Sequence, residues 1–246
     1  MKDPREHLII ALDVSSAAAA RRIVAAVGDS AQIYKVGKQL FTAEGPRIVR
    51  ELVDGGLKVF LDLKYHDIPT TVGAATREAA KLGVSMLTVH ASGGGRMLRA
   101  AVEAAASHPN LIVLGVTVLT SLDDSDLEKV GVRGRVFDQV KRLSALALAS
   151  GCQGIVSSAQ EAPELRKEFG VGFAIVTPGV RPAGGPAGDQ LRVVTPGEAI
   201  AAGATHIVVG RPITEAIDPA AEARAILGEI SSAMPATNRQ PVGARG

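Results

Sequence analysis

The sequence lacks the features that mark several large classes of protein. It has no Trp, only 3% aromatic residues and one cysteine, Cys152, which excludes an intramolecular disulfide and a Cys-based metal cluster. The formal net charge is only +2 and no run of Lys and Arg exceeds two residues, so nucleic acid is not the expected partner. No apolar run is long enough for a signal peptide or a membrane span. We therefore expect a cytoplasmic protein, with Cys152 as a packing residue in its Ala-rich context.

Apolar residues are plentiful, at 46% of the 246 residues. With so few aromatics, the core must consist mainly of Ala, Val, Leu and Ile, which is typical of parallel strands covered by Ala-rich helices. A chain of this length can bury roughly 70 to 75% of its unfolded surface. It also suits an α/β barrel formed as one unit.

Apolar runs alternate with helix-like stretches, and eight of the runs read as strands. Eight strand and helix repeats are what a (β/α)8 TIM barrel requires, whereas a doubly wound open sheet uses the same alternation and is the alternative. A closed barrel is favoured over an open sheet by the number of predicted strands, which is eight, and by the polar residues that follow nearly every strand. The predicted strands are 7–14, 32–37, 58–64, 85–91, 111–119, 154–158, 173–179 and 206–211.

Some helix boundaries can also be predicted. Ser15 or Ser16 can cap a helix over 17–27, and Thr70 or Thr71 can cap a helix that runs to Leu82. The Asp-rich segment 119–140 is expected to be irregular, before a helix that ends near residue 150. No break in composition marks a second domain. We predict one barrel domain over 1–231 and a disordered Pro-, Gly- and polar-rich tail over 232–246.

The stretch DLKYHDIPTTV, residues 62–72, carries the strongest chemical signal. Asp62 and Lys64 are two apart on a predicted strand, so their side chains share one face. Asp67 follows in a loop that Pro69 forces out of the strand, where it can flank the lysine. Flanking carboxylates favour the charged form of Lys64, which then reads as a proton donor. A surface salt bridge at a strand end is the alternative.

Polar residues at the other strand ends are expected to line one pocket with this stretch, because those ends meet at one mouth of a barrel. Each of them alone also reads as a surface cap. His90 could contact a ligand or pack at its strand end. No second His or Glu stands at metal-ligand spacing from His90, so we expect no zinc site. The residues are Asp13, Lys35, Asp62, Lys64, His90, Ser92, Thr117, Thr120, Ser157, Ser158, Gly210 and Arg211.

Two segments near the C-terminus indicate a phosphate site, TPGVRPAGGPAGDQLRV at 177–193 and VVGRPIT at 208–214. In barrels, phosphate commonly binds at the loops after strands seven and eight. Gly210 permits close approach of the backbone, Arg211 offers a planar fork of donors, and Arg181 and Gln190 could fold over the same group. Flexibility alone is the alternative explanation for the Gly-rich loop.

These motifs resemble the orotidine 5'-phosphate decarboxylase family, in its bacterial form with a long TPGVRP…DQ loop. The likeness runs from about residue 8 to residue 227 and is carried by ALDV, YKVG, DLKYHDIPTTV, VLTS, TPGVRP with the later DQ, and VVGRPIT. It implies a homodimeric barrel enzyme that converts orotidine 5'-phosphate to UMP and CO2 in de novo pyrimidine biosynthesis. No metal or organic cofactor is implied.

The resemblance also implies roles for individual residues. Lys64 corresponds to the proton donor to C6 of the pyrimidine, and Asp62 to the group beside the departing carboxylate. Lys35 corresponds to the fourth charged group and contacts ribose together with Asp13. Asp67 corresponds to the carboxylate that enters the site of the other subunit.

The remaining correspondences concern binding. Ile68 and Thr71 accompany Asp67 across the dimer interface, Thr120 contacts the pyrimidine or its closing loop, and Ser158 reads the base. The phosphate is held by Arg181, Gln190, Gly210 and Arg211.

Two rival functions share some of these features. Magnesium-dependent sugar-phosphate decarboxylases and aldolases of related barrels, such as the 3-keto-gulonate 6-phosphate type, also have the D-x-K-x-x-D pattern. They carry a Glu where this chain has Lys35, and an ammonium there would repel the metal. A non-catalytic barrel that binds a phosphorylated ligand is the other rival.

Overall fold

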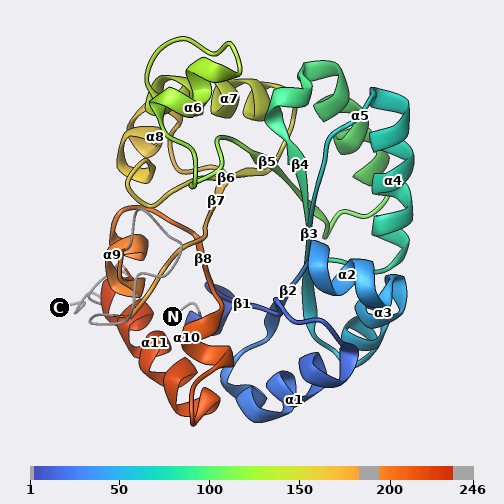
Figure 1. Ribbon diagram of the computed structural model, residues 1–246, viewed down its shortest axis with the longest axis vertical. Helices are drawn as coiled ribbons and strands as arrows, with labels where there is room; N and C mark the ends of the chain where they lie inside the picture. The colour runs from blue at the N-terminus through green and yellow to red at the C-terminus, as the bar shows by residue number, and fades with distance from the viewer. Residues whose placement is uncertain (1–2, 183–193, 235–246) are drawn as a thin grey trace, which may run out of the picture.

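Eight parallel strands close into a barrel (Figure 1), in a computed structural model that describes residues 3–182 and 194–234. Each strand pairs with the next in the sequence, and β1 pairs with β8, so the predicted TIM barrel is confirmed and the open sheet is excluded. The strands are β1 (Leu8–Ala11), β2 (Ile33–Gly37), β3 (Lys58–Tyr65), β4 (Met86–His90), β5 (Ile112–Val116), β6 (Gly154–Val156), β7 (Ala174–Thr177) and β8 (His206–Val209).

Helices surround the ring of strands (Figure 1). They are α1 (Ala17–Val27), α2 (Lys38–Glu44), α3 (Pro46–Asp54), α4 (Pro69–Lys81), α5 (Gly95–Ala105), α6 (Asp124–Lys129), α7 (Val136–Ala149), α8 (Ala162–Phe169), α9 (Pro196–Ala201), α10 (Arg211–Thr214) and α11 (Pro219–Ala233). Among the described residues, no helix combines the length and apolarity needed to cross a bilayer.

The predicted helix boundaries are partly confirmed. Ser16 caps α1, and its hydroxyl accepts the N–H of Ala19 at 3.3 Å. The predicted Thr cap of α4 is wrong, because this helix already begins at Pro69, whose fixed φ suits a first helical position. Both candidate threonines lie in the first turn, and no side chain caps the helix.

Two further segments differ from expectation. The excursion after β5 is not wholly irregular, because Asp123 and Asp126 form a reciprocal capping box that starts α6. The helix after it, α7, does end at residue 149, as predicted. At the C-terminus, α11 includes Ser232 and Ala233, so it extends two residues into the segment predicted as a tail. The rest of that segment, from 235 onward, lies outside the described residues.

The core has two layers because strand side chains alternate between the barrel interior and the surrounding helices. A large cluster lies between strands and helices, and a smaller one fills the barrel interior. The interior cluster includes Ile33, Phe60 and Met86, one from each of three adjacent strands. Two residues further along each of these strands stand Lys35, Asp62 and Thr88. The alternation therefore points polar groups into the barrel directly above its apolar filling. The full interior cluster is Ile9, Ala11, Ile33, Phe60, Met86, Leu114, Val176 and Val208.

The interior leaves no space for a side chain at Gly154. A Cβ there would lie 2.5 Å from the backbone oxygen of Ala174 and 2.8 Å from Leu114 Cδ2. We predict that Gly154→Ala lowers the free energy of unfolding by about 1 to 3 kcal/mol, because backbone must move to accept the methyl group. Urea titration followed by circular dichroism measures the change.

Gly228→Ala is the matched control. Gly228 is exposed within α11, with no atom within 4 Å of a Cβ built there. That variant should gain about 0.5 to 1 kcal/mol from helix propensity and a less flexible unfolded chain. Equal stabilities for the two variants would contradict the packing argument.

Candidate active site

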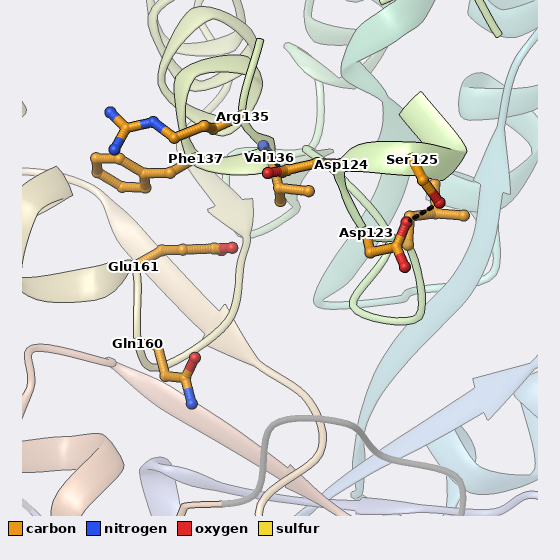
Figure 2. A pocket seen from close by; sticks show the side chains of 9 residues that line it. Asp123, Asp124, Ser125, Arg135, Val136, Phe137, Gln160 and Glu161 are labelled. Atoms are coloured by element: carbon orange, nitrogen blue, oxygen red, sulfur yellow. Dashed lines mark hydrogen bonds between the residues drawn. The ribbon is translucent and has the colours of Figure 1, made fainter. Parts of the chain in front are cut away.

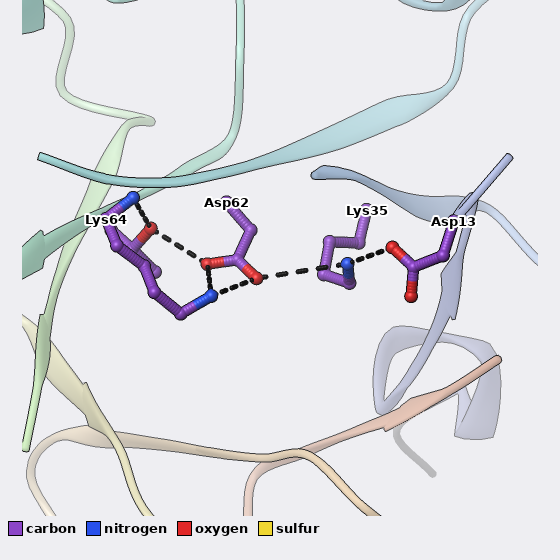
Figure 3. A network of polar contacts seen from close by, with 5 residues as sticks. Asp13, Lys35, Asp62 and Lys64 are labelled. Atoms are coloured by element: carbon purple, nitrogen blue, oxygen red, sulfur yellow. Dashed lines mark hydrogen bonds and ion pairs between the residues drawn. The ribbon is translucent and has the colours of Figure 1, made fainter. Parts of the chain in front are cut away.

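Four side chains at the mouth of the barrel form a row of alternating charge (Figure 3). Lys64 Nζ lies 2.8 Å from both carboxylate oxygens of Asp62. Lys35 Nζ lies 3.9 Å from Asp62 Oδ2 and 2.7 Å from Asp13 Oδ1. The side chain of Asp62 is only 13% exposed and that of Lys35 only 11%, whereas Asp13, at 59%, faces solvent. The row therefore runs from solvent into the barrel.

Simple strand alternation does not fully explain how Lys64 reaches Asp62. The β3–β4 register pairs Leu61 with Leu87 and then Tyr65 with Val89, so three residues of β3 stand opposite one residue of β4. Lys64 adopts φ of 52°, and it is the only non-glycine residue of the described ranges with positive φ. This conformation is uncommon for a residue with a Cβ. The predicted Asp62–Lys64 contact is present, but a bulged and strained strand produces it.

Gly37 leaves space for the outer part of the row. A Cβ on Gly37 would lie 3.0 Å from Lys35 Nζ and 3.2 Å from Asp13 Oδ1. Both contacts are tighter than a side chain normally accepts, so an alanine here would push the ion pair aside. The absence of a side chain at Gly37, the glycine of YKVG, thus leaves room for the ion pair between Lys35 and Asp13.

The row opens onto a cavity of about 290 Å³. Three of the four charged groups, Lys35, Asp62 and Lys64, stand on its wall, and Thr120 stands on the wall as well. The other side is apolar and comes from β5 to β8. A site of this size with few polar groups on an apolar wall suits one small ligand held in one orientation. The remaining lining residues are Phe60, Val116, Val118, Leu119, Ser121, Val156, Ser157, Val176, Pro178 and Val208.

Ser157, rather than Ser158, lines this cavity. Ser158 is buried beside it, where its N–H donates to Glu161 Oε2 at 2.9 Å and its hydroxyl accepts the N–H of Gln160 at 3.4 Å. The Ser157 hydroxyl donates to the same carboxylate oxygen of Glu161 at 2.7 Å. Glu161 therefore fixes both serines, and no sequence motif marks it for this role.

Asp67 does not flank Lys64 within its own chain. Within the described ranges it forms no ion pair within 4.0 Å, and its Oδ1 accepts the N–H of Ile68 at 2.6 Å. The side chains of Asp67 and Thr71 are exposed, as is that of Ile68, at 64%. The flanking position predicted from the residues is therefore wrong for a single chain, and the segment instead extends outward at the start of α4.

His90 stacks on His66, with ring centroids 5.4 Å apart. Burial, the neighbouring His66 ring and the Lys64 ammonium all lower the pKa of His90 from its usual value. The Ser92 hydroxyl lies 3.4 Å from His90 Nδ1. His90 is thus a neutral ring packed beside the row at neutral pH, which matches the packed alternative of the sequence interpretation.

Three of the predicted phosphate residues, Arg181, Gly210 and Arg211, follow the ends of β7 and β8. Gly210 is the N-cap of α10, and Arg211 is its exposed first residue. A Cβ built on Gly210 would lie 4.0 Å from Asp13 Oδ2, so this corner adjoins the charged row. Arg181 is buried and donates to the backbone oxygen of Val180 at 3.1 Å. Gln190 lies outside the described residues.

A larger cavity, of about 650 Å³, lies between the β5–α7 connection and the β6–α8 loop (Figure 2). None of the predicted site residues lines it. Its carboxylates serve the local structure: Asp123 accepts the Ser125 hydroxyl at 2.7 Å, and Asp124 accepts the N–H of Val136 at 2.6 Å. Size alone therefore does not identify the functional cavity.

Other chemistries find little support in the described part of the chain. Three or more His, Cys, Asp or Glu side chains placed to hold a metal ion do not occur within residues 3–182 and 194–234. Burial raises the pKa of the Cys152 thiol to about 12, so this thiol stays protonated and is a poor nucleophile.

Comparison with known proteins connects this site to a family. A family model for Orotidine 5'-phosphate decarboxylase / HUMPS matches residues 6–226. Orotidine 5'-phosphate decarboxylase of Halorhodospira halophila is 53% identical over 228 residues, covering 92% of this chain and 97% of the relative. The enzyme of the same name from Anaeromyxobacter dehalogenans is 52% identical over 223 residues, covering 91% of this chain and 97% of the relative.

A solved structure agrees with the sequence relatives. The crystal structure of Orotidine 5'-phosphate decarboxylase from Lactobacillus acidophilus has a TM-score of 0.83 and 38% identity, covering 92% of this chain and 99% of that one. The resemblance inferred from the motifs is thereby confirmed over nearly the whole barrel. This chain belongs to the orotidine 5'-phosphate decarboxylase / HUMPS family.

Proposed function

We propose that this chain is an orotidine 5'-phosphate decarboxylase, a carboxy-lyase that converts orotidine 5'-phosphate to UMP and CO2 at the mouth of its barrel. The observation that carries the proposal is the row of alternating charge on the wall of the small cavity. Relatives at about 50% identity bear the name of this activity. A cytoplasmic location, and the absence of nucleic acid among its partners, stay predictions from composition.

Lys64 is the proposed proton donor. Loss of CO2 from C6 of the pyrimidine leaves a carbanion-like centre that the ring delocalises poorly, so a fixed cation must stand where the charge develops. Lys64 Nζ is held at 2.8 Å from Asp62, and a fixed ion pair of this kind is the preorganisation that such stabilisation requires. In this proposal Lys64 first stabilises the developing charge and then delivers the proton to C6.

Asp62 is proposed to lie beside the substrate carboxylate. Two carboxylates at close range repel each other, and that repulsion is relieved as CO2 departs. The ammonium groups of Lys64 and Lys35 lie 2.8 and 3.9 Å from Asp62 Oδ2, so two opposite charges offset the carboxylate in this arrangement. Lys35 and Asp13, at the outer end of the row, are proposed to contact the ribose.

A homodimer is proposed to complete the site. Asp67 makes no ion pair with Lys64 of its own chain among the described residues, although only three positions separate them. The Ile68 side chain, 64% exposed, stands next to it, so a carboxylate and an apolar group project together from the turn before α4. We propose that Asp67, Ile68 and Thr71 enter the site of the partner subunit.

The substrate phosphate is proposed to bind where β7 and β8 end. Gly210 gives the backbone room there, and Arg211 supplies a guanidinium at the start of α10. Arg181 and Gln190 are proposed to complete the phosphate site. Because phosphate takes no part in bond breaking, its binding energy can instead help to organise the charged row.

Thr120 and Ser158 are proposed to bind the pyrimidine. Thr120 stands on the cavity wall at the end of β5, and the buried Ser158 follows Ser157 of that wall. A magnesium-dependent reaction is disfavoured because the Lys35 ammonium occupies the space between Asp13 and Asp62, where it would repel a divalent cation.

Lys64→Ala should lower kcat by at least about 10² to 10⁴, because both the proton donor and a fixed charge are lost. Loss of pyrimidine absorbance, followed with orotidine 5'-phosphate in buffer that contains EDTA, measures it. The control is Lys81→Ala, which removes an exposed lysine paired with Glu78 on α4 and should leave turnover unchanged. Near-normal turnover of Lys64→Ala would refute the role, and dependence of the wild-type rate on magnesium would favour the rival chemistry.

Mixing two inactive variants tests the shared site. If Asp67 acts across the interface, co-refolded Lys64→Ala and Asp67→Ala chains should regain about one quarter of the wild-type activity. About half of random dimers are mixed, and each mixed dimer holds one complete site. A mixture of Lys64→Ala with Asp62→Ala is the matched control, because both residues belong to one chain's site and no mixed dimer is then complete. Equal absence of activity in both mixtures would place Asp67 in its own chain's site.

Arg211→Ala should raise KM for orotidine 5'-phosphate roughly 10- to 100-fold, as expected for loss of a charged hydrogen bond. Its effect on orotidine, which lacks the phosphate, should be small. The matched control is Arg224→Ala, an exposed arginine of α11 that the site does not use. An equal loss on both substrates would argue against a phosphate contact.

A further inference from the structure

Thr88 stands where the bulged part of β3 meets β4. It is fully buried and lies alone opposite Asp62, Leu63 and Lys64 in the β3–β4 register. Its hydroxyl oxygen accepts the backbone N–H of Lys64 at 2.9 Å and donates to Asp62 Oδ1, also at 2.9 Å. One hydroxyl group therefore contacts both members of the central ion pair.

The direction of these hydrogen bonds is fixed by chemistry. A threonine hydroxyl has one hydrogen to donate and two lone pairs to accept with. The backbone N–H of Lys64 can only donate, so the hydroxyl hydrogen is free to point at Asp62. Asp62 Oδ1 is thus held from two sides, by Thr88 and by Lys64 Nζ at 2.8 Å.

The backbone of Lys64 depends on the same hydroxyl. A non-glycine residue at φ of 52° is strained, and such strain persists only where surrounding contacts over-determine it. The bulge takes Lys64 out of the regular β3–β4 register. The Thr88 side chain accepts the N–H there and so helps to hold the strained conformation.

We propose that Thr88 is a positioning residue for the decarboxylation. Its hydroxyl fixes the strained backbone of Lys64 and the carboxylate of Asp62 together, so that the ammonium stands where charge develops on the substrate. The proposal rests on the proposed function of the site. Thr88 does not line the cavity, so it acts through Asp62 and Lys64 rather than on the substrate.

Thr88→Val tests the proposal, because valine has nearly the same shape and lacks the hydroxyl. We expect kcat to fall about 10- to 100-fold, as for loss of hydrogen bonds to a charged group, with KM changed by less than about threefold. Thr88→Ser, which keeps the hydroxyl, should recover most of the wild-type kcat. Thr88→Cys, with a weakly bonding thiol, should fall between them and serves in place of valine if that variant does not fold.

Thr76→Val is the matched control. Thr76 is also fully buried, on α4, and its hydroxyl has no hydrogen-bond partner within the described ranges. The same isosteric change there should leave kcat and KM unchanged. A kcat for Thr88→Val within about twofold of the wild type, or, if that variant does not fold, a kcat for Thr88→Cys equal to that of Thr88→Ser, would overturn the proposal.

A crystal structure of Thr88→Val supplies a readout that does not depend on turnover. We expect the backbone of residue 64 to leave its positive φ or the Asp62 carboxylate to rotate, so that the contact with Lys64 Nζ lengthens. An unchanged contact would contradict the proposal even if the wild type proved inactive on orotidine 5'-phosphate. Absence of wild-type turnover together with a lengthened contact would instead refute the proposed function alone.

Discussion

A carboxylate largely removed from water is the constraint on which the mouth of this barrel depends. Asp62 is 13% exposed, and an isolated charge in such a place would be costly. Lys64 Nζ and the Thr88 hydroxyl contact it directly, and Lys35 Nζ lies 3.9 Å away. Lys35 is in turn paired with Asp13, which reaches solvent. Each side chain of the row therefore has a partner of opposite charge within 4 Å.

The two halves of β3 have different functions: the apolar residues up to Leu61 build the core, and Asp62 and Lys64 form the charged row. Phe60 of β3 fills the barrel interior and Val59 and Leu61 pack in the layer between strands and helices, while the bulge that follows releases Lys64 from the regular ladder. A straight strand would also place residues 62 and 64 on one face, but parallel side chains on a regular strand need not meet end to end. The strained backbone turns the lysine so that its Nζ lies equally far from both oxygens of Asp62. Fixed charges of this kind require no reorganisation when the substrate's charge develops.

The barrel fold could be predicted from the sequence because the same pattern recurs along it. Eight apolar runs, alternating side chains and polar strand ends all indicate one topology. The sequence does not predict backbone conformation where pairing with a neighbouring strand determines it. The bulge at Lys64 depends on the register with β4, and no local pattern in DLKYHDIPTTV encodes it. Thr88 could have been found, since it lies two residues after Met86 and two before His90 on the inward face. The Asp-rich segment after β5 resembles a loop in composition, because the acidic residues that form its capping box are also common in loops.

Asp67 illustrates a different case, because the role proposed for it depends on a second chain. Its closeness to Lys64 in the sequence suggests a flanking carboxylate, yet α4 already begins at Pro69, and Asp67 is exposed and does not line the cavity. Pro69 is the first residue of α4, and its ring restricts the backbone just after Asp67 and Ile68. A rigid helix start that presents a carboxylate beside an exposed isoleucine is well suited to enter a neighbouring subunit, since little conformational entropy is lost when it docks. In that arrangement one strand end would supply the lysine of its own site and the carboxylate of the other, which ties assembly of the dimer to completion of the charge array.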